Sequence, residues 1–415
     1  MNVMQKAYKY RIYPTKAQEV TLTQHFGIGR FVYNYIIDRK NEEYKAYKAW
    51  QNNPEGEKPK GKSEFDYHKV LTGLKQELDW VGEAASQTLQ QEVSHVFHAF
   101  NRFYKAVKQR KAKGHKFTNK KGNLLDFPRY KSRKDKQSLS YPQGVKLNTE
   151  AATVTIPKLG QVRAILHRDA IRCVLGVQFT GTIKTCTLSK TVTGKYFLCV
   201  LVEDGTEEPV PSLPDADNAL GIDVGLTHFA TLSDGRKIKN PRLFKRSLKR
   251  LKRVQRSMAR KRNRASINYG KAKMRRALLE ERVGNQRKDF LHKLTHNLVC
   301  ENQATTFCVE DLSVKNMMAN HKLARGIADV SWGEFFRQLK YKSLWHGKTV
   351  LECGRFEPSS KTCGFCGFRL ESLKLDVRKW ECPRCGVDHD RDINAAKNII
   401  LFSFASLLKI PLHRC

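Results

Sequence analysis

The first alternation of apolar and polar positions lies near the start of the chain. Residues Lys6–Tyr13 (KAYKYRIY) alternate basic with apolar or aromatic side chains, which is the pattern of a half-buried β-strand. Pro14 ends this run, and Thr15 with Gln18 fits a capping box at the start of a helix. The sequence therefore predicts a strand followed directly by a helical region.

Helical spacing of apolar residues dominates the next part of the chain. The first helical region is predicted to break around Gly27 and Gly29 and then to resume with a new apolar face. Prolines and glycines in residues 52–63 predict a surface loop. Between Ala85 and Val107 the apolar positions again keep helical spacing, so we expect one long amphipathic helix whose aromatic residues serve packing.

Residues 144–202 change to the two-residue period of β-strands. Short β-branched runs are separated by Gly, Lys and Thr turns, which predicts antiparallel strands in a small barrel. The strand at 6–13 is expected to complete this barrel, which makes the intervening helices an insertion. The predicted strands are 152–156, 162–166, 174–179, 185–189 and 196–202.

Strands and helices alternate in the second half of the chain. An acidic, proline-rich connector, residues 203–217, leads into it, and we place a domain boundary near residue 216. The order of hairpin, helix, strand, helix, strand and final helix suits a ribonuclease-H-like α/β domain. Its predicted elements are the strand 219–225, the hairpin 229–238, the strand 305–309, the helix 332–345 and the strand 349–352.

Acidic residues recur at the ends of these elements. Asp223 stands between two glycines at the end of an apolar strand, and Glu310 and Asp311 end a second one. A third acidic cluster is predicted to open the last helix and comprises Asp388, Asp390 and Asp392. Three carboxylates on neighbouring strands and a helix can hold two divalent ions about 4 Å apart. Magnesium suits such oxygen ligands.

The charge balance narrows the choice of partner. Lys and Arg total 77 against 40 Asp and Glu, for a formal net charge of +37. Such a surplus favours nucleic acid over an anionic membrane surface. The longest apolar run, Ile399–Leu408, is shorter than the roughly 20 residues of a membrane span, and the first residues lack the apolar core of a signal peptide. We therefore expect a soluble cytoplasmic protein.

Basic residues concentrate in a few segments. Residues 242–276 are basic on nearly every helical turn, with only a thin apolar stripe. Because almost no acids offset these bases, a helix beside a phosphate backbone is favoured over a solvated charged helix. Residues 109–123 and 130–136 are also basic and add candidate backbone contacts without identifying single ones.

Four cysteines form two C-x-x-C pairs, Cys363 with Cys366 and Cys382 with Cys385, separated by fifteen residues. This spacing predicts a zinc ribbon with a closed, structural four-thiolate site. His389 is a further candidate ligand, but four thiolates already fill the shell. The remaining cysteines are interpreted as core or incidental thiols: Cys173, Cys186, Cys199, Cys300, Cys308, Cys353 and Cys415.

These motifs together resemble the TnpB family of insertion-sequence proteins, which are RNA-guided DNA nucleases related to type V CRISPR effectors. The resemblance covers nearly the whole chain. Its signatures are GIDVG (221–225), VEDL (309–312), DVSWGEFFRQL (329–339), FEPSSKTC (356–363), CPRCG (382–386) and HDRDINAAKNI (389–399).

The resemblance implies a multidomain α+β fold. A wedge-type antiparallel β-barrel (1–14 and 124–215) would be interrupted by a helical recognition domain (15–123). A RuvC-like, ribonuclease-H-like α/β nuclease domain (216–352 and 387–415) would follow, with a zinc-ribbon target-nucleic-acid-binding insert (353–386).

The resemblance also implies the catalytic set Asp223, Glu310 and Asp392, holding Mg²⁺ or its substitute Mn²⁺, with Asp390 and Asp311 as neighbours. A structured guide RNA from the transposon end would bind the basic surfaces of a monomer. The protein would recognise a short flanking motif, and base pairing would select the double-stranded DNA target. One nuclease site would then cut both strands in turn.

Other functions stay open at this point. Some relatives have lost these carboxylates and act as RNA-guided DNA-binding repressors, whereas this chain retains all three, so cleavage is expected. An accessory transposase protein or a non-guided RNA-binding protein would share the basic surfaces. The basic content does not separate these functions, because it reports affinity for phosphate and not chemistry.

Overall fold

The structure, a computed structural model, describes residues 3–54, 57–114, 127–166, 182–355, 357–374 and 376–408. The chain divides into two compact units, Val3–Thr206 and Glu207–Cys415, called the N-terminal and C-terminal units below. Within the described residues, no helix is both long and apolar enough to cross a membrane.

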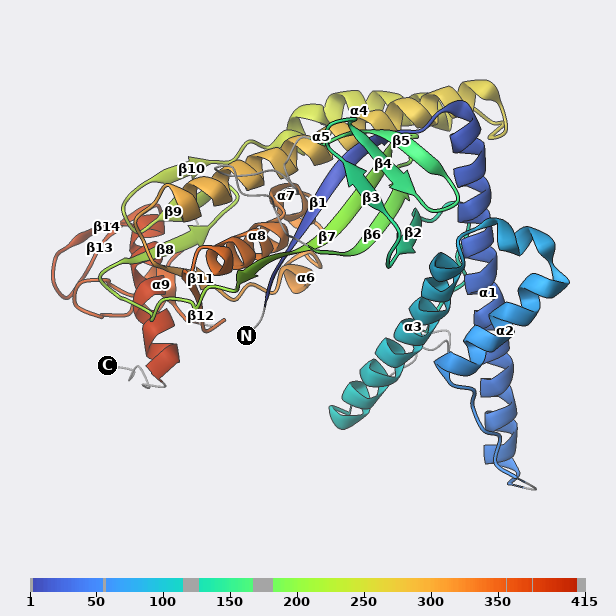
Figure 1. Ribbon diagram of the computed structural model, residues 1–415. Coiled ribbons are helices and arrows are strands. Elements are labelled where there is room, and N and C mark those ends of the chain that lie inside the picture. Colours follow the sequence, from blue (N-terminus) through green and yellow to red (C-terminus); the bar gives the residue numbers. More distant parts are fainter. Residues whose placement is uncertain are drawn as a thin grey trace. The chain divides into compact units, whose positions relative to one another are not determined.

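A seven-stranded sheet forms one of the two parts of the N-terminal unit, in the order β2-β6-β7-β1-β5-β4-β3. The strand predicted at the start of the chain is β1 (Val3–Tyr13), which lies between β7 (Tyr196–Glu207) and β5 (Gly160–Ile165) (Figure 1). Antiparallel pairing joins β2 with β6, β6 with β7, β1 with β5, β5 with β4, and β4 with β3. The other strands are β2 (Gln137–Tyr141), β3 (Lys146–Asn148), β4 (Thr153–Ile156) and β6 (Thr182–Lys190).

The sheet buries one face, as its alternating sequence predicts. Alternate residues such as Tyr10 and Ile12 of β1 and Leu198 and Val200 of β7 belong to one apolar core. The predicted strand 174–179 lies outside the described residues. In the described part of the chain β2 and β3 are the sheet edges, so closure into a barrel stays a prediction.

Helices α1 (Lys16–Asn52), α2 (Glu64–Glu77) and α3 (Ser86–Ala112), with the short 3-10 helix η1 (Asp79–Glu83), follow β1. The predicted capping box is present at α1: the Thr15 amide donates to Gln18 Oε1 at 3.0 Å, and the Gln18 amide donates to Thr15 Oγ1 at 3.3 Å. The three helices share a separate apolar core. The long helix predicted from Ala85 is α3.

The predicted break at Gly27 and Gly29 is wrong, because α1 runs without interruption from Lys16 to Asn52. Gly29 serves close packing instead. A Cβ at this position would lie 2.7 Å from Leu139 Cδ2 in β2, so a larger residue would require the Leu139 side chain to shift. Packing on both sides of the helix outweighs the modest helix penalty of the two glycines.

The acidic connector begins later than expected. Strand β7 continues to Glu207, and Glu203 within it pairs with Lys184 of β6 at 2.8 Å. The two units divide between Thr206 and Glu207, upstream of the boundary predicted near residue 216. Residues beyond the division join the C-terminal unit through hydrogen bonds such as that from the Ser212 amide to the Gly347 carbonyl oxygen, at 2.8 Å.

The C-terminal unit is built on a five-stranded sheet in the order β10-β9-β8-β11-β12. Strands β8, β11 and β12 run parallel, while β9 and β10 continue antiparallel from β8. The strands are β8 (Ala219–Val224), β9 (His228–Leu232), β10 (Lys237–Lys239), β11 (Thr306–Glu310) and β12 (Thr349–Cys353). All five correspond to strands predicted from the sequence.

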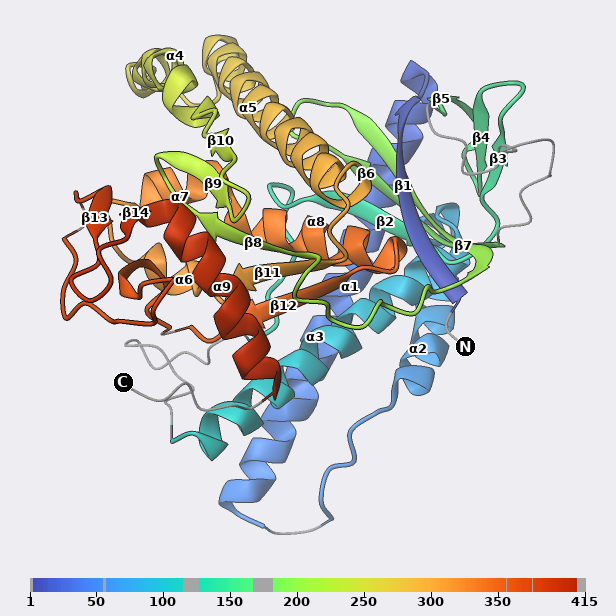
Figure 2. The same ribbon diagram turned by 90° about the vertical axis from the view of Figure 1, so that its left-hand side faces the viewer.

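Helices cover both faces of this sheet. Ile222, Phe307 and Val309 point to the face that packs against α5 (Ile267–Cys300) and α8 (Trp332–Trp345). Cys308 and Cys353 point to the other face and pack against Ile399 of α9 (Arg391–Leu408). Figure 2 shows α9 crossing strands β8, β11 and β12. The short helices α6 (Val314–Met317) and α7 (Ala324–Val330) connect β11 with α8.

The basic segment 242–276 forms parts of two helices. Helix α4 (Leu243–Ala259) ends before a turn, and Ser266 caps the start of α5 by accepting from the Tyr269 amide at 3.2 Å. Leu251 of α4 is buried, whereas the basic residues of this helix are mostly exposed. Those residues are Lys245, Arg246, Lys249, Arg250, Lys252, Arg253 and Arg256.

The segment between β12 and α9 contains the 3-10 helix η2 (Ser359–Lys361) and the strands β13 (Lys379–Glu381) and β14 (Asp388–Asp390). Asp388 and Asp390, predicted to open the last helix, lie on β14 instead. Antiparallel pairing with β13, where Trp380 faces His389, holds these residues extended until α9 begins at Arg391. Asp392 lies in the first turn of α9, as predicted.

Candidate functional site

Asp223 and Asp392 come together because a helix crosses a strand at a glycine. Gly221 and Asp223 lie two residues apart on β8 and therefore face the same side of the sheet. A Cβ at position 221 would lie 1.9 Å from the Ala396 carbonyl oxygen, so the backbone of α9 rests on this glycine. Asp392 precedes Ala396 by one helical turn, close enough for its charge to act on Asp223.

The register between β8 and β11 places Glu310 beside Asp223. Val309 on β11 is the partner of Ile222 on the parallel strand β8, and both belong to the core on the α5 and α8 face. The next residues, Glu310 and Asp223, therefore neighbour one another on the α9 face. The structure thus gathers Asp223, Glu310 and Asp392 at the ends of β8 and β11 and the start of α9.

Ionisation of Asp223 and of Glu310 is disfavoured in this site. Burial raises the pKa of Asp223 well above its ordinary value of 3.8, and the charges of Glu310 and Asp392 raise it further, opposed by Arg391. Burial also raises the pKa of Glu310, against the effect of a hydrogen bond donated by Ser359 Oγ to Glu310 Oε1 at 2.8 Å. Two neighbouring carboxyl groups with raised pKa are typical of a functional site.

The residues fit hard cations. All three carboxylates are partly accessible, and their oxygen atoms are the ligands that Mg²⁺ and Mn²⁺ prefer. Within the described residues, the ligand atoms of these carboxylates lie farther apart than the four cysteine sulfurs described below.

The neighbouring acids have other partners. Asp390 accepts from the amides of Asp392 and Ile393, both at 3.2 Å, at the start of α9, and pairs with Lys237 Nζ at 2.6 Å. Burial would raise the pKa of Asp390, but these donors outweigh it and lower the pKa. Asp311 is half-exposed and forms an ion pair with Arg355 Nη2 at 2.6 Å. Asp390 thus caps the start of α9, whereas Asp311 forms a surface ion pair.

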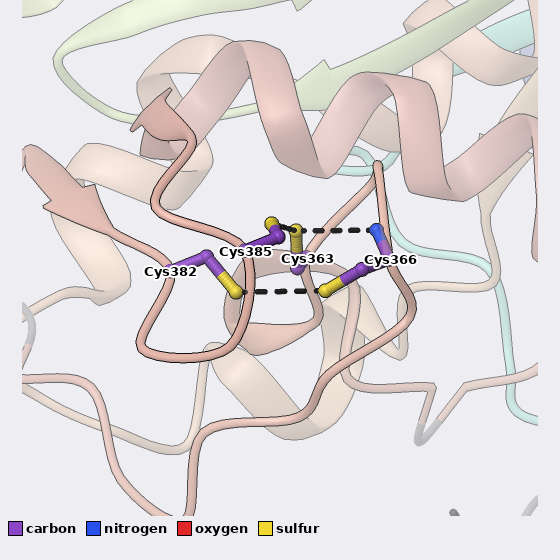
Figure 3. A group of neighbouring side chains, drawn as sticks. All are labelled: Cys363, Cys366, Cys382 and Cys385. Carbon is purple, nitrogen blue, oxygen red and sulfur yellow. Dashed lines mark hydrogen bonds between the residues drawn. The ribbon is translucent and has the colours of Figure 1, made fainter.

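The second candidate centre is a cluster of four thiols. The sulfur atoms of Cys363, Cys366, Cys382 and Cys385 all lie within 4.8 Å of one another, and Figure 3 shows the four side chains pointing toward a common centre. Cys363 and Cys385 sulfurs are 3.7 Å apart, and those of Cys366 and Cys382 are 3.6 Å apart. Four converging thiols fit a structural zinc ion.

Two turns of the same design present these thiols. In each, the first cysteine amide donates five residues ahead, from Cys363 to Phe368 O at 2.8 Å and from Cys382 to Val387 O at 3.0 Å. The glycine after the second cysteine donates back to the first and has a positive φ, 75° at Gly367 and 70° at Gly386. The motif C-x-x-C-G therefore encodes the turn as well as the ligands.

His389 lies beside this cluster and outside it. Its Nε2 is 3.0 Å from Cys363 Sγ, and its ring packs on Trp380 with centroids 4.6 Å apart. At this distance the imidazole can hydrogen-bond to the Cys363 sulfur and orient it without being one of the four clustered ligands. Of the other cysteines, Cys186, Cys308 and Cys353 are buried, as expected for core thiols, and Cys300 is exposed. Cys173 and Cys415 lie outside the described residues.

Three residues with contacts to these centres were not singled out from the sequence. Ser359, Asn394 and Asn398 are buried and link the segment before Cys363 to α9 and to Glu310. Ser359 lies in the motif SSKTC, and the two asparagines lie in the motif NAAKN. Nothing in the spacing alone tells a buried asparagine from an exposed one.

The basic surface of α4 is anchored by an acid from another segment. Asp329 of α7 accepts from the amides of Phe244 and Lys245 at the start of α4 and from Arg287 Nη2 of α5 at 3.3 Å. Its closest contact is 2.9 Å, to the Phe244 amide. A carboxylate at a helix N-terminus satisfies free amides and opposes the positive helix end.

Comparison with known proteins gives matches along the chain. Family models match residues 197–321 ("Probable transposase"), 332–399 ("Cas12f1-like, TNB domain") and 1–49 ("Helix-turn-helix domain"). A Streptomyces pristinaespiralis protein named "Putative RNA-guided DNA endonuclease" is 36% identical over 98% of this chain and 91% of its own length. The chain belongs to the TnpB family.

The chain is also similar to a second curated protein and to a solved structure. The Escherichia coli protein "Putative RNA-guided DNA endonuclease InsQ" is 31% identical over 97% of this TnpB-family chain and 93% of its own length. A solved structure titled "Cryo-EM structure of the Cas12f1-sgRNA-target DNA complex" has a TM-score of 0.48 and 14% identity, over 96% of this chain and 99% of that chain. Residues matched by the helix-turn-helix model form β1 and most of α1.

Proposed function

We propose that this chain is a metal-dependent, RNA-guided DNA endonuclease whose hydrolytic centre consists of Asp223, Glu310 and Asp392. The observation that carries the proposal is the meeting of these three carboxylates, from β8, β11 and α9, on one face of the sheet. Membership of the TnpB family, whose curated relatives are named as such endonucleases, supports it.

The carboxylates would hold two divalent ions, Mg²⁺ or Mn²⁺, which supply a nucleophilic water and stabilise the leaving oxygen of a phosphodiester. The role of this chain's own residues is to hold negative charge at a fixed place. Gly221 sets the approach of α9, the β8 and β11 register sets Glu310 beside Asp223, and Asp390 fixes the first turn of α9. The thiols Cys363, Cys366, Cys382 and Cys385 would hold a structural zinc ion, which supplies folding energy.

The partners follow from the charge and the family. We propose that a guide RNA from the transposon end binds the basic surfaces of a monomer, and that a double-stranded DNA with a short flanking motif is the target. The exposed face of α4 is a candidate for phosphate contacts. The assignments of the sheet as wedge domain, of α1–α3 as recognition domain and of residues 353–386 as target-binding insert belong to the same proposal, as does action in the prokaryotic cytoplasm.

The test begins with the RNA that copurifies when the protein is expressed with its native flanking DNA. A DNA library that matches the 3′ end of this RNA next to randomised flanks serves as substrate. Asp223→Ala is expected to abolish cleavage and to leave RNA and target binding nearly intact, while the control Asp311→Asn cleaves normally. Cleavage by Asp223→Ala at the wild-type rate, or a heterogeneous RNA population, would overturn the proposal.

A further inference from the structure

Glu310 has a hydrogen-bond partner that lies just ahead of the first cysteine pair. Ser359 is 5% exposed, and its hydroxyl donates to Glu310 Oε1 at 2.8 Å. A hydroxyl that donates to one oxygen restricts rotation of the carboxylate and leaves the second oxygen available to a cation. The position of the segment that carries Ser359 therefore affects the orientation of the Glu310 carboxylate.

Helix α9 holds this segment through two buried asparagines. Asn398 Nδ2 donates to the carbonyl oxygens of Ser359, at 2.8 Å, and Thr362, at 2.6 Å. Asn394 Nδ2 donates to the Thr362 carbonyl oxygen at 2.7 Å. Asn394 Oδ1 accepts from the Gly364 amide at 2.9 Å. These side chains are 1% and 3% exposed, for Asn398 and Asn394 respectively, so their bonds are shielded from water.

The same short segment ends in the thiol cluster. Cys363 follows Thr362 directly, and Gly364 lies within the first C-x-x-C turn. The helix that holds the segment also supplies Asp392, two residues before Asn394. One set of hydrogen bonds thus joins a thiol of the second centre, the start of α9 and the partner of Glu310.

We propose that Ser359 is a positioning residue for Glu310, and that Asn394 and Asn398 couple the four-thiol centre to the carboxylate centre. The inference rests on the proposed function, in which Glu310 is a ligand of the divalent ions. It gives the four-thiol segment a second role, because the ordered turn at Cys363 keeps Ser359, and through it Glu310, in place.

The first experiment tests Ser359. Ser359→Ala removes the hydroxyl, Ser359→Thr retains it, and Ser360→Ala is the control at the adjacent serine, for which no bond to Glu310 is present among the described contacts. Ser359→Ala is expected to weaken Mn²⁺ binding, measured by electron paramagnetic resonance, roughly 10-fold. The catalytic rate constant falls while the KM for DNA and the zinc content stay unchanged. Ser359→Thr recovers most of the loss.

The second experiment tests the coupling from the zinc side. A Cβ at Gly364 would lie 2.9 Å from Asn394 Oδ1 and 3.2 Å from Asn398 Oδ1, so Gly364→Ala is expected to shift the Asn394 side chain and to crowd Asn398. Faster zinc release to a chelating dye is expected together with weaker Mn²⁺ binding. The control is Gly333→Ala, an exposed glycine of α8 whose Cβ would meet nothing within 4 Å.

The outcomes separate the inference from the proposed function. If Ser359→Ala binds Mn²⁺ as well as Ser360→Ala does, the positioning role is wrong. If Gly364→Ala releases zinc faster but binds Mn²⁺ normally, the coupling is wrong. If Glu310→Gln cleaves DNA at the wild-type rate, the proposed hydrolytic centre itself is wrong, whatever the other variants do.

Discussion

The carbonyl oxygen of Ala396 occupies the space in which a side chain on Gly221 would lie, since a Cβ there would be 1.9 Å away. This contact fixes the height of α9 above β8, and with it the position of Asp392 relative to Asp223. Glycine is required here for close approach of two backbones, not for an unusual φ.

Gly221→Ala tests this contact. Because the clash is with backbone and not with a flexible side chain, α9 has to move, and we expect a loss of about 1–3 kcal/mol or more in unfolding free energy. Chemical denaturation measures the loss, and cleavage is expected to be abolished. Gly270→Ala, in an open position of α5, is the control and should be neutral or slightly stabilising. Wild-type stability in Gly221→Ala would contradict the close packing of α9 on β8.

Asp223→Asn is expected to stabilise the protein in the absence of divalent ions. The pKa of Asp223 is raised above 3.8 by burial and by Glu310 and Asp392, so the folded state binds a proton more tightly than the unfolded state does. The contribution of this group to stability is therefore greatest at acidic pH and falls as the pH rises from near 3.8 through the raised pKa. Removing the charge should raise the free energy of unfolding by on the order of 1 kcal/mol at neutral pH.

Thermal denaturation from about pH 4 to about pH 8, with a chelator present, measures this effect. Asp223→Asn should flatten the decline with pH, and Mg²⁺ should raise the melting temperature of the wild type more than that of the variant. Asp311→Asn, which removes an exposed ion pair with Arg355, should change stability by at most about 1 kcal/mol. Equal pH dependence in Asp223→Asn and the wild type would contradict the raised pKa of Asp223.

Cys382→Ser is expected to lose zinc. The replaced thiol is one of four that converge within 4.8 Å, and a structural zinc site contributes roughly 10 kcal/mol or more to local folding. Metal analysis of the purified protein measures zinc per chain, and impaired loading of target DNA should accompany the loss. Cys300→Ser alters an exposed thiol and should retain zinc. Unchanged zinc content in Cys382→Ser would refute the assignment.

Asp329→Ala is expected to loosen the start of α4. Phe244 and Lys245 lose their capping acceptor and Arg287 loses its partner, at a cost of about 0.5–2 kcal/mol. Hydrogen exchange at the Phe244 amide reports the local change, and RNA binding should weaken if the basic face depends on this anchor. Glu280→Ala, which removes an exposed pair with Arg276, should leave that exchange rate unaltered.

The strands that carry the acids were predictable, because their signals are local. Apolar runs that end in Asp223 and Glu310 define the strand ends, with glycines on both sides of Asp223, and the two C-x-x-C-G motifs encode both ligand and turn. The continuity of α1 was not predictable, because the sequence shows Gly29 as a weak helix former and does not show Leu139 packed against it. Asp388 and Asp390 were misplaced for the same reason: the partner strand β13 is set by tertiary pairing.

The parallel arrangement of β8, β11 and β12 affects when the acidic centre forms during folding. Asp223, Glu310 and Asp392 belong to segments far apart in the chain, joined by strand pairings and by the seat of α9 on Gly221. Contacts of such high sequence separation carry a large loop-closure cost and form late. During refolding, helical signal from α4 and α5 should therefore return well before the capacity to cut DNA.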